Sequence, residues 1–140
     1  MRLDLYQAES ERIAHEQMAL LDEAKQRILS DAPPSRLEES GVLHALPVLI
    51  ENAIGKSKHM LKAAGRPVPV SAYDAFASLE QNGDINSQEL QQWNSAIRLR
   101  NRIIHEYMNI DMRVIYEFIT SERQKFVGAF LRKPISATEN

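Results

Sequence analysis

Residues 86–107 read NSQELQQWNSAIRLRNRIIHEY and carry apolar side chains at helical spacing over their whole length. Asn86 with Glu89 three residues later forms a capping-box pattern, which marks the start of a helix. On a helical wheel at about 100° per residue, the apolar side chains form one contiguous arc, made of Leu90, Trp93, Ala96, Ile97, Leu99, Ile103, Ile104, Tyr107 and Ile110. The sequence therefore predicts a helix from Asn86 to about Tyr107 with one wide apolar face.

The same period recurs on both sides of this stretch, and no strand-like alternation interrupts it. Pro33 and Pro34 end a long first helix, and Ser35 with Glu38 starts the next one. The predicted helices cover residues 3 to about 30, 35–64, 71–79, 86–107 and 112–131. We therefore expect one all-α domain, residues 1–133, folded as an antiparallel bundle of about five helices and followed by a flexible tail, residues 134–140.

The composition of the 140 residues excludes several classes of protein. There is no cysteine, which excludes a disulfide framework, a thiolate zinc site and a cysteine nucleophile. The longest apolar run, Ala45–Ile50, is far shorter than the ~20 residues needed to cross a bilayer, and the first residues lack the apolar core of a signal peptide. No Gly-rich phosphate loop and no helical His pair is present. We expect a soluble, cytoplasmic protein without a membrane segment, a metal or a bound cofactor.

Charge is distributed unevenly along the chain, although the formal net charge is only −2. Residues 1–97 hold nine Lys/Arg and fourteen Asp/Glu, a net charge of −5, whereas residues 98–133 hold eight and four, a net charge of +4. An anionic ligand is therefore expected to meet the C-terminal part. Within that part, Arg100 falls in the middle of the apolar arc, where a guanidinium is costly to bury unless it is paired or faces a wet cleft.

Several polar side chains accompany Arg100 on the predicted helix. Asn101 and His105 lie one turn apart at the border of the apolar arc, and Arg98 and Arg102 occupy the solvent face nearby. Two interpretations are open at this point: a structural ion pair beside a packed histidine, or a site that binds an anion and moves a proton. For Arg98 and Arg102, contact with an RNA backbone competes with a role as solvated surface residues.

The sequence Arg100-Asn101-Arg102-Ile103-Ile104-His105-Glu106-Tyr107 resembles the signature of the HEPN superfamily. That signature is an arginine, a polar residue, a histidine after four intervening positions and, in one variant, a tyrosine two residues further on. The variant is similar to the HepT-like toxins of MNT–HEPN toxin–antitoxin modules. Other stretches extend the likeness over roughly residues 35–131; they are residues 50–61, 73–76, 79, 82–83 and 109–111.

The resemblance implies a metal-independent endoribonuclease that is active as a homodimer and cleaves single-stranded or loop RNA. It assigns Arg100 to stabilising the phosphate and the transition state, His105 to acid–base catalysis, and Asn101 to orienting them. One histidine cannot act as base and acid at once, whereas two facing chains supply two histidines. Because histidine titrates near pH ~6.5, one of the two can be neutral while the other is protonated.

The resemblance also implies a switch at Tyr107. A minimal nucleotidyltransferase antitoxin, similar to MntA, would transfer AMP from ATP to this tyrosine and silence the RNase, as in type VII-like toxin–antitoxin pairs. A tyrosine at this position also fits plain interface or core packing. Two other functions stay open: a non-catalytic helical module that docks substrate for a separately encoded nucleotidyltransferase, and a simple structural dimer. The toxin is favoured, since neither alternative needs a charge on the apolar arc.

Overall fold

The computed structural model describes residues 2–135 and contains, within that range, six helices and no strand. The helices are α1 (Leu3–Ile28), α2 (Arg36–Ala63), α3 (Ala72–Gln81), α4 (Ser87–His105), α5 (Met112–Thr120) and α6 (Arg123–Arg132). The predicted all-α bundle is confirmed, with one helix more than expected. Of the predicted tail, residues 136–140 lie outside the described residues. None of the six helices is both long enough and apolar enough to cross a membrane.

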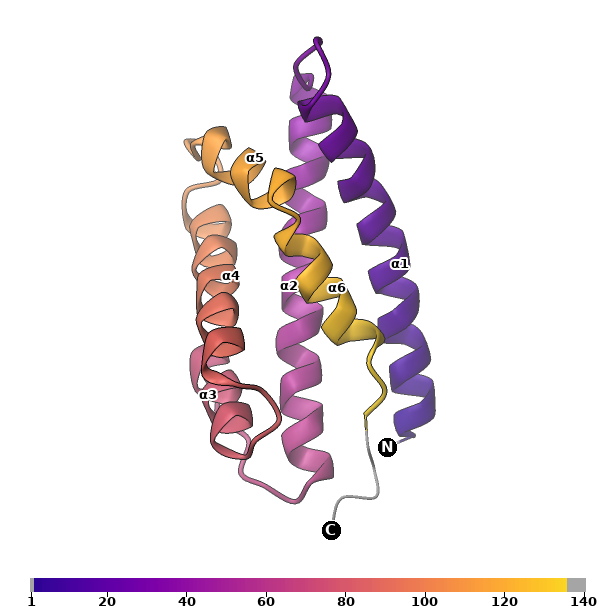
Figure 1. Ribbon diagram of the computed structural model, residues 1–140, viewed down its shortest axis with the longest axis vertical. Helices are drawn as coiled ribbons and strands as arrows, with labels where there is room; N and C mark the ends of the chain where they lie inside the picture. The colour runs from indigo at the N-terminus through magenta and orange to yellow at the C-terminus, as the bar shows by residue number, and fades with distance from the viewer. Residues whose placement is uncertain (1, 136–140) are drawn as a thin grey trace.

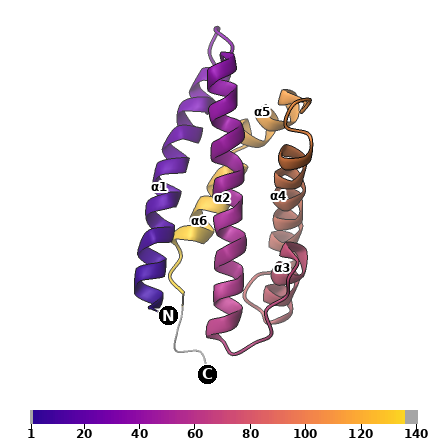
Figure 2. The ribbon, with the colours of Figure 1, turned by 180° about the vertical axis from the view of Figure 1, so that it is seen from behind.

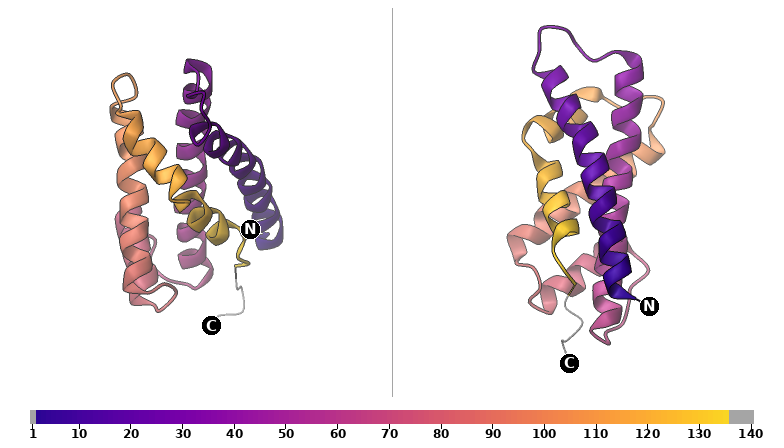
Figure 3. Two further views of the ribbon diagram at one scale, coloured as in Figure 1. Left: turned by 45° about the horizontal axis from the view of Figure 1, so that its top comes forward. Right: turned by 90° about the vertical axis from the view of Figure 1, so that its right-hand side faces the viewer.

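The bundle is built around α2. α1 and α2 form a long antiparallel hairpin, and α2 also packs against α3, α4 and α6 (Figure 1). α6 crosses α2 obliquely and reaches α1, while α4 stands upright on the other side of the molecule (Figure 3). Seen from behind, α3 lies beside the N-terminal half of α4 only (Figure 2). The C-terminal half of α4 therefore has no cover from α3.

Side-chain caps confirm the predicted starts of α2 and α4. Ser35 Oγ accepts from the backbone N–H of Glu38 at 3.1 Å, and the Glu38 carboxylate accepts from the N–H of Ser35 at 2.8 Å. Asn86 and Glu89 form the same reciprocal pair, at 2.8 and 2.9 Å. Each capping box provides acceptors for two backbone N–H groups at the helix N-terminus, where such groups have no partner within the helix. Local chemistry thus fixes where these two helices begin.

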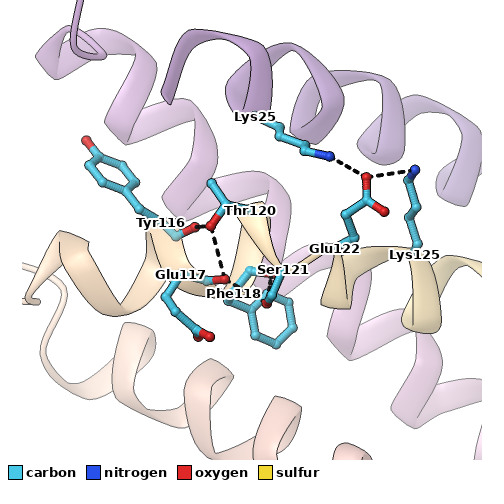
Figure 4. Close-up of polar contacts among 8 residues, drawn as sticks. All are labelled: Lys25, Tyr116, Glu117, Phe118, Thr120, Ser121, Glu122 and Lys125. Carbon is cyan, nitrogen blue, oxygen red and sulfur yellow. Dashed lines mark hydrogen bonds and ion pairs between the residues drawn. The ribbon is translucent and has the colours of Figure 1, made fainter. Parts of the chain in front are cut away.

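The prediction of one continuous helix over residues 112–131 is wrong, because the chain breaks at Ser121 and Glu122. Glu122 adopts a left-handed backbone conformation with φ 63°. Its carboxylate pairs with Lys25 of α1 and with Lys125 of α6 (Figure 4), so ion pairs hold the break. The Ser121 hydroxyl donates to the Glu117 carbonyl at 2.7 Å and satisfies an acceptor at the end of α5.

An aromatic cluster closes the core between α3, α4 and α6. The ring of Trp93 lies 4.3 Å from that of Phe76 and 4.8 Å from those of both Phe126 and Phe130, centroid to centroid. Trp93 and Phe76 are fully buried. These contacts fix the N-terminal half of α4 against its neighbours, since large buried rings carry much of the packing energy of a small domain.

Lys56 of α2 is a buried cation that joins α2 to the end of α6. Its ammonium donates to the carbonyls of Phe130 at 2.6 Å and Leu131 at 3.3 Å, and also to that of Lys133. The last turn of a helix leaves such carbonyls unpaired and partly negative, so a cation is favourable there. Burial lowers the pKa of Lys56 to about 8, which leaves the ammonium mostly protonated at neutral pH.

Replacing Lys56 with methionine keeps an unbranched stem but removes the donor from these carbonyls. We expect Lys56→Met to lower the free energy of unfolding by about 2 kcal/mol, because a buried acceptor left without a donor costs roughly 1–3 kcal/mol. Lys62→Met, on the exposed side of the same helix, should change it by less than about 0.5 kcal/mol. Urea denaturation measures both variants, and equal stabilities would contradict the role given to Lys56.

Candidate functional site

The predicted site residues gather on the C-terminal half of α4, beyond the reach of α3. The apolar arc of this helix changes character along its length: Ile97 is fully buried, whereas Ile104 is 49% exposed. The wide apolar face predicted from the sequence is therefore covered by the bundle in its first half, whereas in its second half Ile103 is still buried and the side that carries Ile104 is open. Arg100 lies at the transition between the two halves and is itself half-buried.

Arg100 has no partner for its buried atoms within residues 2–135. Its Nε is inaccessible to solvent and makes no hydrogen bond there. No ion pair between described residues includes this guanidinium. Arg100 is therefore not held on this face by a structural ion pair with another described residue. Because arginine cannot shed its charge, the side chain is suited to an anion or to a group from another chain.

Asn101 and His105 follow Arg100 on the same helix and come together at its end. Asn101 is half-buried and His105, the last residue of α4, is exposed. They are at positions i and i+4 of the helix, so their side chains are neighbours on the helix surface. Asn101 and His105 thus lie along one side of the last turns of α4, whose apolar face carries Arg100. An amide, an imidazole and a guanidinium are groups that can bind a phosphate and exchange a proton.

Tyr107 is placed differently from the prediction. α4 ends at His105, and Tyr107 lies in the turn that follows, where the N–H of Asn109 donates to the Glu106 carbonyl at 2.9 Å. It therefore does not continue the helical face of Arg100. The tyrosine is 47% exposed, and its neighbour Met108 is 86% exposed. The Tyr107 side chain is thus accessible from solvent.

Tyr116 differs from Tyr107 in the surroundings of its hydroxyl group. Its hydroxyl donates to the Glu39 carboxylate across the α2–α5 contact. Burial and the negative charge of Glu39 raise the pKa of Tyr116 to about 12. A phenol whose proton is held in this way is a poor nucleophile, so of these two tyrosines only Tyr107 presents an accessible acceptor.

Arg98 and Arg102 lie on the neighbouring side of α4, as predicted. Arg98 is exposed, while Arg102 is half-buried and lies 3.6 Å from the Glu106 carboxylate. Beside them is a hollow of about 160 Å³ between α4 and the α5–α6 segment. Arg123, from the start of α6, also lines this hollow, and the sequence analysis did not single it out. No signal in the sequence pointed to it, because the break before α6 was not predicted.

The remaining histidines do not join the site. His15 and His44 are exposed on other helices. His59 packs against Tyr6, with 4.0 Å between ring centroids, and burial lowers the pKa of its imidazole. Within residues 2–135, no three His, Asp or Glu side chains lie close enough together to hold a metal ion.

Comparison with protein families matches residues 14–132 to the family described as ribonuclease HepT-like. A comparison with curated proteins finds no match.

Solved structures with the same fold come from toxin–antitoxin complexes. A toxin–antitoxin structure with AMP-PNP has a TM-score of 0.66 and 18% identity, covering 85% of this chain and 97% of the other. The tri-AMPylated HEPN toxin of Shewanella oneidensis, in complex with an MNT antitoxin, has a TM-score of 0.65 and 19% identity, covering 85% and 93%. A tyrosine-to-alanine mutant of the MntA–HpeT pair has a TM-score of 0.64 and 18% identity, covering 85% and 94%. At these identities the likeness establishes the fold.

Proposed function

The chain belongs to the family of HepT-like ribonucleases, as its Arg–His motif predicted, and from this premise we propose that it is the RNA-cleaving toxin of a type VII-like toxin–antitoxin pair. Its site would combine Arg100, Asn101 and His105 from two copies of the chain. The observation that carries the proposal is the buried Nε of Arg100, which finds no partner within the described residues. A charge left in this way lowers stability, and a role in binding phosphate accounts for its retention.

The proposed reaction needs a base, an acid and positive charge, and these side chains can supply all three. The 2′-hydroxyl oxygen of the RNA attacks the adjacent phosphorus, the bond to the 5′ oxygen breaks, and a cyclic phosphate remains. A neutral His105 accepts the proton of the 2′-hydroxyl, and the protonated His105 of the second chain gives a proton to the departing oxygen. Arg100 stabilises the extra negative charge on phosphorus oxygens in the transition state. No step requires a metal ion.

The second chain would seat on the open half of α4. Ile104, Tyr107 and Met108 are exposed apolar residues at this end of the molecule. An isologous dimer that covers them brings the two motifs face to face, so that Arg100 lines the cleft between the chains. Dimerisation would thus both bury apolar surface and complete the set of catalytic groups.

A cognate nucleotidyltransferase antitoxin, similar to MntA, would control the enzyme through Tyr107. The phenol oxygen attacks the α-phosphorus of ATP, pyrophosphate leaves, and the phenolic proton is released. The product places a phosphodiester charge close to Arg100 and His105, where the RNA phosphate has to bind. The exposure of Tyr107 in the turn after α4 supports this assignment.

Arg100→Ala and His105→Ala should each reduce RNA cleavage by at least ~100-fold, because acid–base and electrostatic catalysis are each worth that much. The control is His15→Ala on the exposed side of α1, which should cleave at the wild-type rate. Cleavage of a fluorescent RNA measures all three variants, and EDTA should leave the wild-type rate unchanged. Full activity of His105→Ala would favour the non-catalytic docking module instead.

The wild-type chain should sediment as a dimer at micromolar concentration. Ile104→Asp should give a folded monomer that no longer cleaves RNA, since a carboxylate on the contact face is costly to bury. Leu5→Asp alters a leucine on α1 that is even more exposed than Ile104, and this variant should stay dimeric. Analytical ultracentrifugation decides, and a fully active wild-type monomer would exclude the shared site.

Incubation with ATP, Mg²⁺ and the antitoxin should add AMP to the wild-type chain and to Tyr116→Phe, but not to Tyr107→Phe. Both variants keep their rings, so the fold should persist, and Tyr107→Phe should escape silencing. Intact-mass spectrometry reads the modification directly. An adduct that persists on Tyr107→Phe, or an adenylated chain that cleaves RNA at the unmodified rate, would remove Tyr107 from the switch.

A further inference from the structure

The hollow between α4 and the α5–α6 segment is lined by three arginines, and we refer to it as the arginine hollow. Arg98 and Arg102 come from α4 and Arg123 from α6, over a floor that includes the buried side chains of Leu99 and Phe118. Its volume is about 160 Å³. Glu117 also lines it, so positive charge exceeds negative charge on its walls.

The arginines of this hollow are largely uncompensated by acidic groups of the described chain. No ion pair between described residues includes Arg98 or Arg123. Arg102 has only the longer contact of 3.6 Å with Glu106. Arg123 is held instead by a neutral group, since its Nη1 donates to Ser95 Oγ of α4 at 3.3 Å. The guanidinium is thereby directed towards α4 while its charge stays available.

The break between α5 and α6 is what sends Arg123 to this place. Glu122, in the left-handed conformation, turns towards α1 and pairs with Lys25 (Figure 4). The next residue, Arg123, reaches the opposite neighbour, α4. Two consecutive residues of opposite charge are thus divided between two helices, and only the positive one faces the hollow.

We propose that the arginine hollow binds a backbone phosphate of the RNA strand, next to the phosphate that is cleaved. Arg98, Arg102 and His105 follow one another at steps of four and three residues, so they lie along one side of α4. A rise of 1.5 Å per residue puts Arg98 about 10 Å from His105 along the helix axis. A strand held at His105 can therefore continue along this side of α4 into the hollow. A planar guanidinium group can donate two parallel hydrogen bonds to two oxygens of one phosphate.

This inference rests on the proposed ribonuclease function, but binding can be tested apart from cleavage. A short fluorescent 2′-O-methyl oligouridylate lacks the attacking 2′-hydroxyl and serves as a probe that cannot be cut. Its affinity for the wild-type chain is measured by anisotropy between about 50 and 200 mM salt, where each phosphate contact contributes roughly 0.7 to the slope of log K against log salt. The variants are Arg98→Gln, Arg123→Gln and the pair, with Arg66→Gln in the exposed α2–α3 connection as control.

We expect each single variant to reduce the slope by roughly 0.7 and to bind roughly fivefold more weakly near 0.1 M salt. The double variant should lose both contacts, Arg123→Lys should restore part of the affinity, and Arg66→Gln should match the wild type. An unchanged slope in Arg123→Gln would overturn the inference, as would an equal loss in Arg66→Gln. The inference would also be overturned if Arg98→Gln or Arg123→Gln bound the probe normally but no longer bound the antitoxin. The hollow would then be a contact site for an acidic protein surface.

The two proposals fail in different ways. If His105→Ala retains cleavage while the salt slope depends on Arg123, the ribonuclease assignment is wrong and the phosphate site stands. If His105→Ala abolishes cleavage while Arg98→Gln and Arg123→Gln leave the salt dependence of binding unchanged, the ribonuclease assignment stands and the phosphate site is wrong.

Discussion

The packing of Trp93 against three phenylalanines is the interaction on which the rest of this structure depends. It ties α3 and α6 to the N-terminal half of α4, and side chains of this size are worth roughly 3–5 kcal/mol each when buried. This packing does not extend along the whole of α4, because α3 is only ten residues long and covers the N-terminal half of α4 alone (Figure 2). The second half of α4 still packs on the core through Ile103, but it is open on the side of Arg100 and Ile104. A rigid support and an uncovered face are therefore two consequences of the same packing.

The open face explains how a costly arginine is tolerated. An apolar residue at position 100 would extend the core or a simple dimer contact, and it would avoid the free-energy penalty of a half-buried guanidinium. Asn101 and His105 form no part of the buried core either. The C-terminal half of α4 therefore departs from the rules that stabilise the first half, and such departures concentrate at functional sites, where binding a ligand compensates for the lost stability.

The sequence predicted those features that neighbouring residues determine. Ser35 with Glu38 and Asn86 with Glu89 are complete local signals, so the starts of α2 and α4 were predictable, and the Arg–His spacing indicated the family. The break at Glu122 was not predictable, because no proline or glycine marks it and the apolar period continues through Phe118, Val127 and Leu131. At the break Glu122 pairs with Lys25, almost a hundred residues away, and no local pattern reveals such a contact. The early end of α4 was missed for a similar reason, since Glu106 and Met108 are good helix formers.

The missed break matters for function as well as for fold. In a continuous helix, successive side chains turn by about 100°, so Glu122 and Arg123 would face adjoining directions and partly cancel each other's charge. One left-handed residue separates them, with the carboxylate on α1 and the guanidinium on α4. Of the basic residues in this segment, Arg98, Arg102 and Arg123 are thereby placed around one hollow beside α4. The phosphate site that we propose therefore depends on the break, because a continuous helix over these residues would bring the Glu122 carboxylate next to Arg123 and weaken the attraction of the hollow for a polyanion.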